Sequence, residues 1–323
     1  MSLVSIIIPV YNVEKYIRRC LISIQSQTMT DIEIIVVNDG TTDNSMNTVH
    51  ELAKDDQRIK ILNHEMNMGL MWTRRTGYMA ATGDYITFCD SDDYLPPNAL
   101  KILYDEAKRT GADIVSGNNI HVSPDGSEQT MRVHLPYGTD RKGVYKAMLC
   151  GDLWHSLCDK IFRASLLQNH NYQTFAHVTN GEDACLLYQI IANIDKMVLI
   201  PEAVYCYVDN DGSSTRRRLS RQALRSICIA QRIKIDMVSD CPELNEDLNR
   251  NVCNVLCTLY LNGYNSKGVL SREIHDNGLE HYISIKKIFR YLSVKRILRT
   301  LIAYIIHRWQ SLFVDLWDKI KNQ

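Results

Sequence analysis

The chain lacks the long uncharged apolar run that a membrane-spanning helix requires, because no segment offers 18 such residues. It also lacks a net charge, since 37 Lys and Arg residues balance 37 Asp and Glu residues, and no basic run carries interleaved aromatics. We therefore expect neither a membrane span nor a nucleic-acid partner. The first apolar run ends at Pro9 without a basic segment before it, so no signal peptide is expected.

Cysteine is present without the spacing of a metal site or a disulfide framework. The chain has 10 cysteines, and none forms a Cys-x-x-Cys pair. Several lie in apolar periodic runs, as buried thiols do. Because disulfide frameworks are typical of small secreted chains, we expect free thiols in a reducing cytoplasm.

A glycine-rich phosphate loop is missing as well. No Gly-x-Gly-x-x-Gly follows the first apolar run, and Gly-x-x-x-x-Gly-Lys-Ser/Thr occurs nowhere. A phosphate-bearing ligand would need another counter-charge, and a divalent cation is the natural alternative.

Apolar runs that predict strands alternate with segments of helical periodicity. Strands are predicted at 4–10, 32–38, 59–62, 85–89 and 113–116. Helices are predicted after Asn12, which could cap the first of them, and at 41–55, 69–81 and 97–109. This alternation predicts an α/β fold with a mostly parallel sheet flanked by helices. The chain is mostly helical from Leu219, so we expect an α/β domain at 1–218 and a helical region at 219–323.

The tetrapeptide Asp90-Ser91-Asp92-Asp93 directly follows the buried run 85–89. Carboxylates this close repel each other, and a hard divalent cation with oxygen ligands relieves that repulsion. The alternative is an acidic turn in which Asp93 caps the segment opening at Pro96-Pro97. The tetrapeptide by itself does not distinguish the two.

Polar residues also follow the first two predicted strands. Tyr11 follows the first, and Asp39 follows the second. Ligands of open parallel sheets bind beyond the carboxyl ends of the strands, so these residues and the acidic tetrapeptide should line one nucleotide site. In it, Tyr11 would lie beside a base and Asp39 would accept a hydrogen bond from a ring N–H. For each residue alone, a packing aromatic or a simple Asp-Gly turn explains the sequence equally well.

Five segments together resemble the family 2 nucleotide-sugar glycosyltransferases. They are VSIIIPVYN at 4–12, IEIIVVNDGTTDNS at 32–45, NMGL at 67–70, ATGDYITFCDSDDYL at 81–95 and GEDACLL at 181–187. The resemblance covers roughly residues 3–215 and implies a GT-A, Rossmann-like fold. It also implies an inverting transferase that uses a nucleotide diphosphate sugar, usually UDP-linked, with Mn²⁺ or Mg²⁺.

The resemblance assigns roles residue by residue. Asp90 and Asp92 match the D-x-D motif that serves the nucleotide-sugar and the metal, with Asp92 as the direct metal ligand. Asp183 matches the general base, and Glu182 its orienting or acceptor-binding neighbour; a plain helix N-terminus is the alternative. The other positions implied in nucleotide-sugar binding are Pro9, Tyr11, Glu14, Asp39, Asn67, Arg74 and Ser91.

One stretch departs from the family's pattern, and two further segments resemble parts of the family's catalytic domain. The family's Ala-Arg-Asn appears here as Thr73-Arg74-Arg75, so Arg74 would neutralise the diphosphate or pair with an aspartate, or else lie on a helix surface. Residues 154–163 resemble a segment beside the donor sugar. Residues 207–216, with Ser213 and Ser214, resemble a loop that closes over the diphosphate. The basic run 216–218 could also contact phosphate oxygens, but a solvated basic loop explains it better. The histidines His64, His155 and His177 have no ligand spacing and are expected to be structural or at the surface.

Residues 286–308 carry basic and apolar side chains without any acid. A basic amphipathic segment can lie on an anionic membrane, although packing on the body of the protein or on a partner chain is the alternative. We therefore expect a cytoplasmic enzyme, peripheral on the inner face of the plasma membrane through 286–323, that glycosylates a glycan or lipid-linked acceptor for a surface polysaccharide. The rival functions are a nucleotidyltransferase that makes a sugar nucleotide and a non-catalytic nucleotide-binding homologue.

Overall fold

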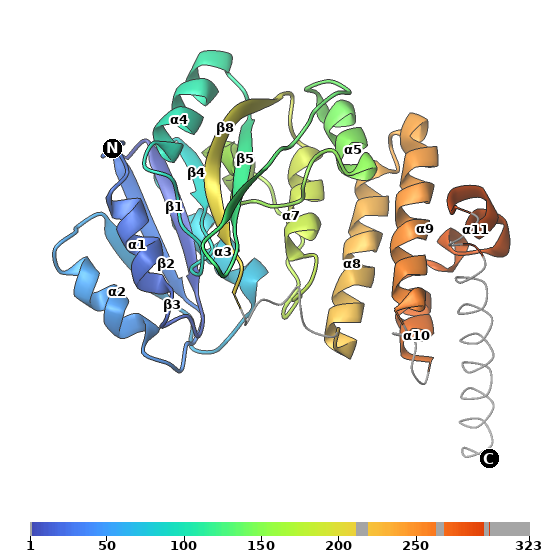
Figure 1. Cartoon of the computed structure of the whole chain (residues 1–323), viewed down its shortest axis with the longest axis horizontal. Helices are drawn as coiled ribbons and strands as arrows, with labels where there is room; N and C mark the ends of the chain where they lie inside the picture. Colours follow the sequence, from blue (N-terminus) through green and yellow to red (C-terminus); the bar gives the residue numbers. More distant parts are fainter. Residues whose placement is uncertain (1, 211–218, 263–267, 294–296, 298–323) are drawn as a thin grey trace, which may run out of the picture. The chain divides into compact units, whose positions relative to one another are not determined.

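The computed structural model describes residues 2–210, 219–262, 268–293 and 297. The chain divides into two compact units, the first comprising 1–178 and 182–216 and the second 179–181 and 217–323. In Figure 1 the strands lie in the first unit and the second is helical. Among the described residues, no helix is long and apolar enough to cross a membrane.

The first unit is built on one sheet with the strand order β3-β2-β1-β4-β7-β5-β6, in which β8 also pairs with β5. The strands β1, β2, β3 and β4 are parallel, β7 is antiparallel to both of its neighbours, and β8 is parallel to β5. The strands are β1 (Val4–Val10), β2 (Ile32–Asn38), β3 (Ile59–Asn63), β4 (Tyr85–Phe88), β5 (Ile114–Val122), β6 (Glu128–Met131), β7 (Lys160–Arg163) and β8 (Met197–Val208). The predicted mostly parallel α/β sheet is therefore confirmed.

Helices flank this sheet, and their apolar positions explain where they pack (Figure 1). They are α1 (Ile17–Gln25), α2 (Ser45–Ala53), α3 (Leu70–Ala80), α4 (Ala99–Thr110), α5 (Arg141–Cys150), α6 (Ala164–Gln168) and α7 (Glu182–Ile191). Helix α3 lies against β1, where Gly77 leaves room for Ile7: a Cβ at Gly77 would meet the Ile7 side chain at 2.2 Å. This close packing fixes the height of α3 over the sheet.

One predicted helix start is wrong. Helix α1 begins at Ile17, and Asn12 does not cap it. Instead Asn12 takes a left-handed backbone conformation with φ 54°, and its side-chain oxygen accepts a hydrogen bond from the Thr42 N–H at 3.1 Å. Asparagine tolerates this conformation better than most residues. Asn12 therefore ties the end of β1 to the loop that follows β2.

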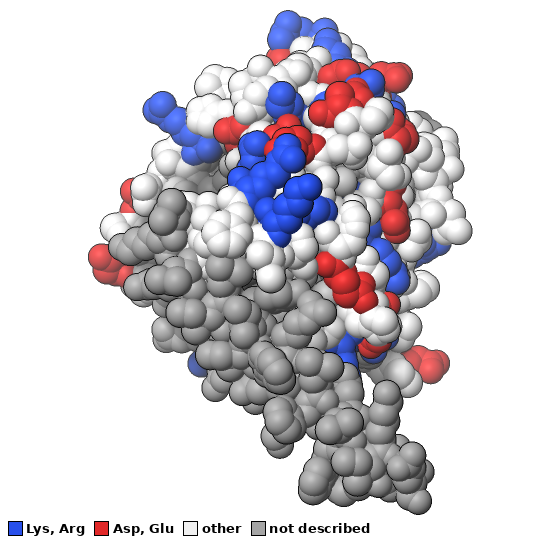
Figure 2. All heavy atoms as spheres, turned by 90° about the vertical axis from the view of Figure 1, so that its right-hand side faces the viewer, with Lys and Arg blue, Asp and Glu red and all other residues white. Residues whose placement is uncertain are grey.

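The second unit consists of helices packed through apolar faces. They are α8 (Arg221–Val238), α9 (Asn245–Leu261), α10 (Val269–Asp276) and α11 (Ile285–Tyr291), with short 3₁₀ turns η2 (Pro242–Leu244) and η4 (Glu280–Tyr282). Lys234 is 3% exposed and donates to Gln231 and Asn251, which joins α8 to α9 by a buried polar link. Figure 2 shows the right-hand side of Figure 1, where one cluster of Lys and Arg side chains lies among scattered Asp and Glu side chains.

Candidate active site

The carboxyl ends of β1, β2 and β4 meet at one edge of the sheet. The parallel register pairs Val10 with Asn38, and Ile7 with Phe88. Tyr11, which follows β1, is 45% exposed, whereas Pro9 is buried within the strand. The structure therefore brings the predicted strand-end residues to one edge and leaves the Tyr11 ring open to solvent.

Both carboxylate oxygens of Asp39 accept hydrogen bonds from other groups of the protein. Its two oxygens accept hydrogen bonds from the backbone N–H groups of Met68, at 2.8 Å, and Gly69, at 2.9 Å. His64 Nδ1 lies 2.7 Å from the same oxygen as the Met68 N–H, and its Nε2 lies 2.8 Å from the Thr76 hydroxyl. Asp39 is only 3% exposed. Its carboxylate thus holds the 67–69 turn at the end of β2, and His64 has the structural role expected of it.

The 67–69 turn also contacts the segment that precedes α7. Gly69, the residue before α3, has φ +89°, and a Cβ there would lie 2.9 Å from the backbone nitrogen of His177. Only glycine combines this φ with so close an approach. Asn67 lies in the same turn and is half-buried, while Glu14 is exposed and accepts from the backbone N–H of Asn44 at 3.1 Å.

The carboxylates of the acidic tetrapeptide Asp90-Ser91-Asp92-Asp93 have different hydrogen-bond partners. Asp93 is 2% exposed and accepts hydrogen bonds from the Tyr205 hydroxyl at 2.5 Å and the Val208 N–H at 2.7 Å. It therefore fastens the loop to β8, and the alternative that it caps the next helix is wrong. Burial, reinforced by Asp92 and Asp90, raises the pKa of Asp93 well above its usual range.

Asp92 is the carboxylate of this loop with the weakest protein partner. The Asn210 amide donates to it at 3.3 Å. Burial, followed by the charge of Asp90, raises the pKa of Asp92, so the charge on this side chain is poorly compensated. Ser91, between the two aspartates, is buried. Sequence reasoning missed Tyr205 and Asn210, because nothing in their local sequence marks residues that contact a loop more than 110 positions earlier.

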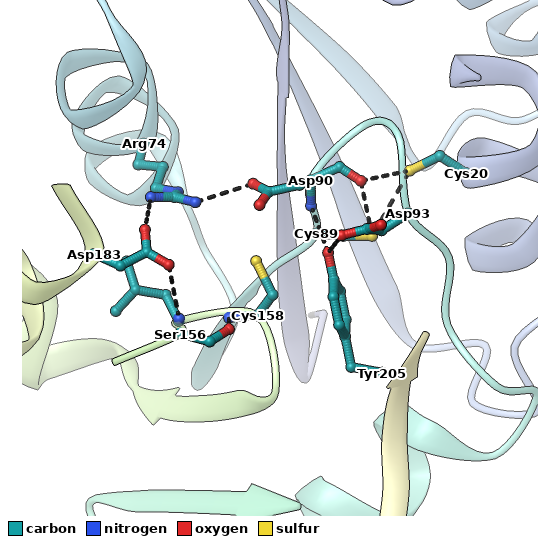
Figure 3. Close-up of polar contacts among 10 residues, drawn as sticks. Cys20, Arg74, Cys89, Asp90, Asp93, Ser156, Cys158, Asp183 and Tyr205 are labelled. Atoms are coloured by element: carbon teal, nitrogen blue, oxygen red, sulfur yellow. Dashed lines mark hydrogen bonds and ion pairs between the residues drawn. The ribbon is translucent and has the colours of Figure 1, made fainter. Parts of the chain in front are cut away.

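Two buried thiols lie beneath Asp90. The sulfurs of Cys20 and Cys89 are 3.7 Å apart, and each lies within 3.7 Å of the Asp90 carbonyl oxygen (Figure 3). Their mutual contact and their burial raise the pKa of Cys89 well above its usual range. Both side chains pack as small apolar groups between α1 and the end of β4.

Arg74 connects the acidic loop to α7. One Nη of its guanidinium donates to Asp90 at 3.0 Å and the other donates to Asp183 (Figure 3). The Arg74 side chain is 1% exposed. Of the two roles proposed from the sequence, the structure thus shows pairing with an aspartate, and it shows two such pairs.

The adjacent Arg75 serves the fold differently. It donates to the Tyr172 carbonyl at 2.9 Å, the Thr174 hydroxyl at 3.2 Å and the Asn171 amide oxygen at 2.9 Å. All three acceptors are uncharged and lie in one loop before α7. The departure from the family's asparagine therefore adds a clamp between α3 and this loop.

The acidic pair Glu182-Asp183 begins α7. Asp183 accepts from Arg74 through one oxygen, and the Leu157 N–H approaches the other at 3.4 Å. Burial raises the pKa of Asp183, and the Arg74 charge opposes that rise. Burial, with the charge of Asp183, raises the pKa of Glu182 to about 7. Glu182 Oε2 has no hydrogen-bond partner among the residues that the structure describes.

A fully buried ion pair shapes the loop that faces Asp183. Asp159 and Lys160 are both 0% exposed, and Lys160 Nζ lies 2.8 Å from the Asp159 carboxylate. Lys160 also donates to the carbonyls of Ser156, at 2.7 Å, and Trp154, at 3.4 Å. The pair therefore fixes the irregular segment 154–159, whose Leu157 N–H points to Asp183.

The described residues contain no group of three or more His, Cys, Asp and Glu side chains placed as a metal site. Asp92 nevertheless fits a cation, because it is a carboxylate of raised pKa beside a second carboxylate. Further oxygens would have to come from a bound diphosphate and water. Ser213, Ser214 and the basic run 216–218 lie outside the described residues.

The chain is similar in sequence to known glycosyltransferases. Residues 5–165 match the model of glycosyl transferase family 2. The chain is 33% identical over 223 residues to the uncharacterized glycosyltransferase EpsJ of Bacillus subtilis, with 67% of this chain and 63% of EpsJ aligned. It is 30% identical over 213 residues to the poly(ribitol-phosphate) beta-glucosyltransferase of Bacillus spizizenii, with 65% of this chain and 33% of that protein aligned.

The fold resembles a solved structure over nearly its whole length. The complex of S. aureus TarS 1–349 with UDP-GlcNAc matches with a TM-score of 0.71 and 18% identity, covering 97% of this chain and 89% of that one. The chain therefore belongs to glycosyl transferase family 2 through residues 5–165, and the expected GT-A fold is confirmed. It spans less than two thirds of the length of the two curated relatives above.

Proposed function

We propose that the chain is a metal-dependent, inverting glycosyltransferase that moves a sugar from a UDP-sugar to a hydroxyl of a glycan or lipid-linked acceptor, in the synthesis of a surface polysaccharide. The observation that carries this proposal is the Arg74 bridge, which holds the strand-end Asp90 and the helix-end Asp183 to one guanidinium. The family supports a sugar-nucleotide reaction, and the relative named for poly(ribitol-phosphate) supports a polymeric acceptor.

The proposed reaction is a single in-line displacement. Asp183 accepts the proton of the acceptor hydroxyl while that oxygen bonds to the anomeric carbon. The bond from the anomeric carbon to the diphosphate oxygen breaks, and UDP departs with the electron pair. A divalent cation held by Asp92, with Asp90 beside it, would offset the charge on the departing diphosphate.

The base of the donor would lie at the ends of β1 and β2. The exposed Tyr11 ring offers a flat face there, and the 67–69 turn held by Asp39 borders it. TarS was solved with UDP-GlcNAc and with UDP, which supports UDP as the nucleotide. Glu182, the neighbour of the proposed base, would orient that base or contact the acceptor; its buried Oε2 has no hydrogen-bond partner among the described residues.

The rival functions are less well supported. A nucleotidyltransferase would typically carry a glycine-rich basic loop after the first strand, and residues 11–16 lack one. A non-catalytic homologue would not need an aspartate at each of positions 90, 92 and 183.

The test is release of UDP, GDP or dTDP from a panel of nucleotide sugars with Mn²⁺, Mg²⁺ or EDTA. We expect metal-dependent release from a UDP-sugar by the wild type and its loss in Asp92→Ala. Equal release with metal and with EDTA would overturn the role of the cation. Absence of both release and calorimetric nucleotide binding would overturn the enzyme proposal.

We also propose that the region beginning at α11 contacts an anionic membrane surface. In α11, Ile285 is 54% and Phe289 57% exposed, Lys286 is exposed, and no acid lies in the helix. Residues 294–296 and 298–323 of the predicted membrane segment lie outside the described residues. Full-length protein should sediment with phosphatidylglycerol vesicles more than with phosphatidylcholine vesicles, and Phe289→Ser should weaken this; equal sedimentation with both lipids would contradict it.

A further inference from the structure

Arg74 is placed behind the two carboxylates that it joins. Its side chain is 1% exposed, whereas the side chains of Asp90 and Asp183 are 34% and 24% exposed. A side chain that is 1% exposed offers almost no surface to a bound donor or to solvent. Figure 3 shows the guanidinium between the two carboxylates, which are the more exposed partners of both ion pairs.

The geometry of the guanidinium fixes the spacing of these carboxylates. One Nη binds Asp90 and the other binds Asp183, which are separated by 93 positions in the chain. Because the guanidinium is planar and rigid, the two acceptor oxygens are held at a nearly constant separation. A lysine has a single ammonium on a flexible stem and would not impose this spacing.

Stability alone does not explain a charge at this position. Arg74 Nε has no hydrogen-bond partner among the described residues, and the Phe88 ring lies 5.9 Å from the guanidinium carbon. Burying a charged group with an unsatisfied donor costs free energy, and well-packed apolar residues often serve stability as well as a buried ion pair does. Arg75, one residue later, clamps its loop through neutral acceptors only.

We propose that Arg74 is a positioning residue, which holds the base Asp183 at a set distance from Asp90 so that the acceptor hydroxyl and the donor sugar are aligned for displacement. This inference rests on the proposed function. Arg74 acts through Asp183 and does not contact the substrate. Its charge also opposes the rise in the pKa of Asp183 and thereby favours the ionised, proton-accepting form of that side chain.

The test uses the full-length protein with Mn²⁺ and the UDP-sugar that the wild type hydrolyses in the panel above. Arg74→Gln keeps a polar side chain without the charge, and Arg74→Lys keeps the charge without the rigid fork. Arg75→Gln is the matched control on the same helix. For each variant, the rate of UDP release is measured against pH, UDP affinity by calorimetry, and the melting temperature by circular dichroism.

We expect Arg74→Gln to lower the maximal rate of UDP release by about 100-fold, the order of a misplaced catalytic group, while UDP affinity changes by less than about threefold. The pH below which the rate falls should rise, because Asp183 loses the charge that favours its ionised form. Arg74→Lys should recover part of the rate and the wild-type pH profile. Arg75→Gln should lower the melting temperature with little change in the profile.

A double variant tests whether Arg74 affects the rate of UDP release through Asp183. In an Asp183→Asn background, Arg74→Gln should lower the rate little further, because the base through which it acts is already gone. A full additional loss would overturn the inference, as would UDP affinity lost in step with the rate, since both would place Arg74 on the donor. If the wild type releases UDP and Arg74→Gln releases it at the same rate, this inference is wrong but the proposed function stands. If the wild type neither binds nor releases UDP, the proposed function is wrong.

Discussion

The two acidic groups of the site, Asp90 to Asp93 after β4 and Glu182-Asp183 at the start of α7, look alike in sequence but are used differently. In the first group the innermost residue, Asp93, is consumed by hydrogen bonds to β8, and Asp92 keeps the poorly compensated charge. In the second group Asp183 takes the protein contacts, whereas Oε2 of the neighbouring Glu182 has no hydrogen-bond partner within the described part of the chain. Adjacent carboxylates can thus have opposite duties, set by what packs around each one.

The largest effect is expected from a substitution in the second acidic group, Glu182-Asp183. Asp183→Asn removes the proposed proton acceptor while keeping the shape of the side chain, so UDP release should fall by about 1,000-fold, within the range for loss of a general base. UDP affinity, measured by calorimetry, should stay within about threefold of the wild type. The exposed Asp195→Asn is the control, and near wild-type turnover in Asp183→Asn would place the base elsewhere.

The next largest effect tests whether Asp92, and not a neighbouring aspartate, is the ligand of the cation. Asp92→Asn should weaken UDP binding in Mn²⁺ by about 100-fold, because a neutral amide is a poor ligand for a hard cation. The affinity left should be close to that of the wild type in EDTA. Mn²⁺ that still tightens UDP binding to the variant would show that Asp92 is not the ligand.

Asp93 should be distinguished from Asp92 by stability. Asp93→Ala leaves the Tyr205 hydroxyl and the Val208 N–H without their acceptor, at a cost of about 2–3 kcal/mol in the free energy of unfolding. Tyr205→Phe removes one of these bonds and should cost about 1 kcal/mol. Urea unfolding measures both, and an Asp93→Ala protein as stable as the wild type would show that the bond to β8 does not stabilise the loop.

The smallest effect concerns Glu182 and is pH-dependent. Its pKa is about 7 in the folded chain, above the unfolded value, so the folded state binds the proton more tightly. This contribution to stability is complete below the unfolded pKa of about 4.3 and is lost as the pH rises through the folded value. Glu182→Gln should therefore flatten the pH dependence and raise the free energy of unfolding at pH 8 by about 1–2 kcal/mol.

The matched control for this measurement is the exposed Glu202→Gln, which should leave the profile unchanged. Urea unfolding at pH 5 and pH 8 provides the comparison. A Glu182→Gln profile that parallels the wild type would show that the environment of this carboxyl group does not raise its pKa in solution.

Much of the first unit is predictable because its signals are local. The apolar runs of β1 and β2 and the stepped apolar positions of α1 record burial directly, so the strands and helices up to β5 follow from periodicity. The end of β5 was not predicted, because glycine and polar residues occupy positions 117–119 and 121, and the pairing of this part with β6 and β8 depends on strands elsewhere in the chain. The start of α1 was misplaced because the Asn12 side chain binds Thr41 and Thr42 instead of the helix.

The sequence by itself determined which strand ends carry polar chemistry and where the two acidic groups lie, because both are properties of neighbouring residues. Only the tertiary structure decided that Arg74 joins these groups, that Asp93 is bound to Tyr205, and that Asp39 is closed on the 67–69 turn. Except for the Arg74–Asp90 pair, each of these contacts joins residues that are 29 or more positions apart in the chain. All of them depend on how α3, α7 and β8 pack beside the sheet. Local patterns record burial and charge, whereas the partner of a charge is set by packing.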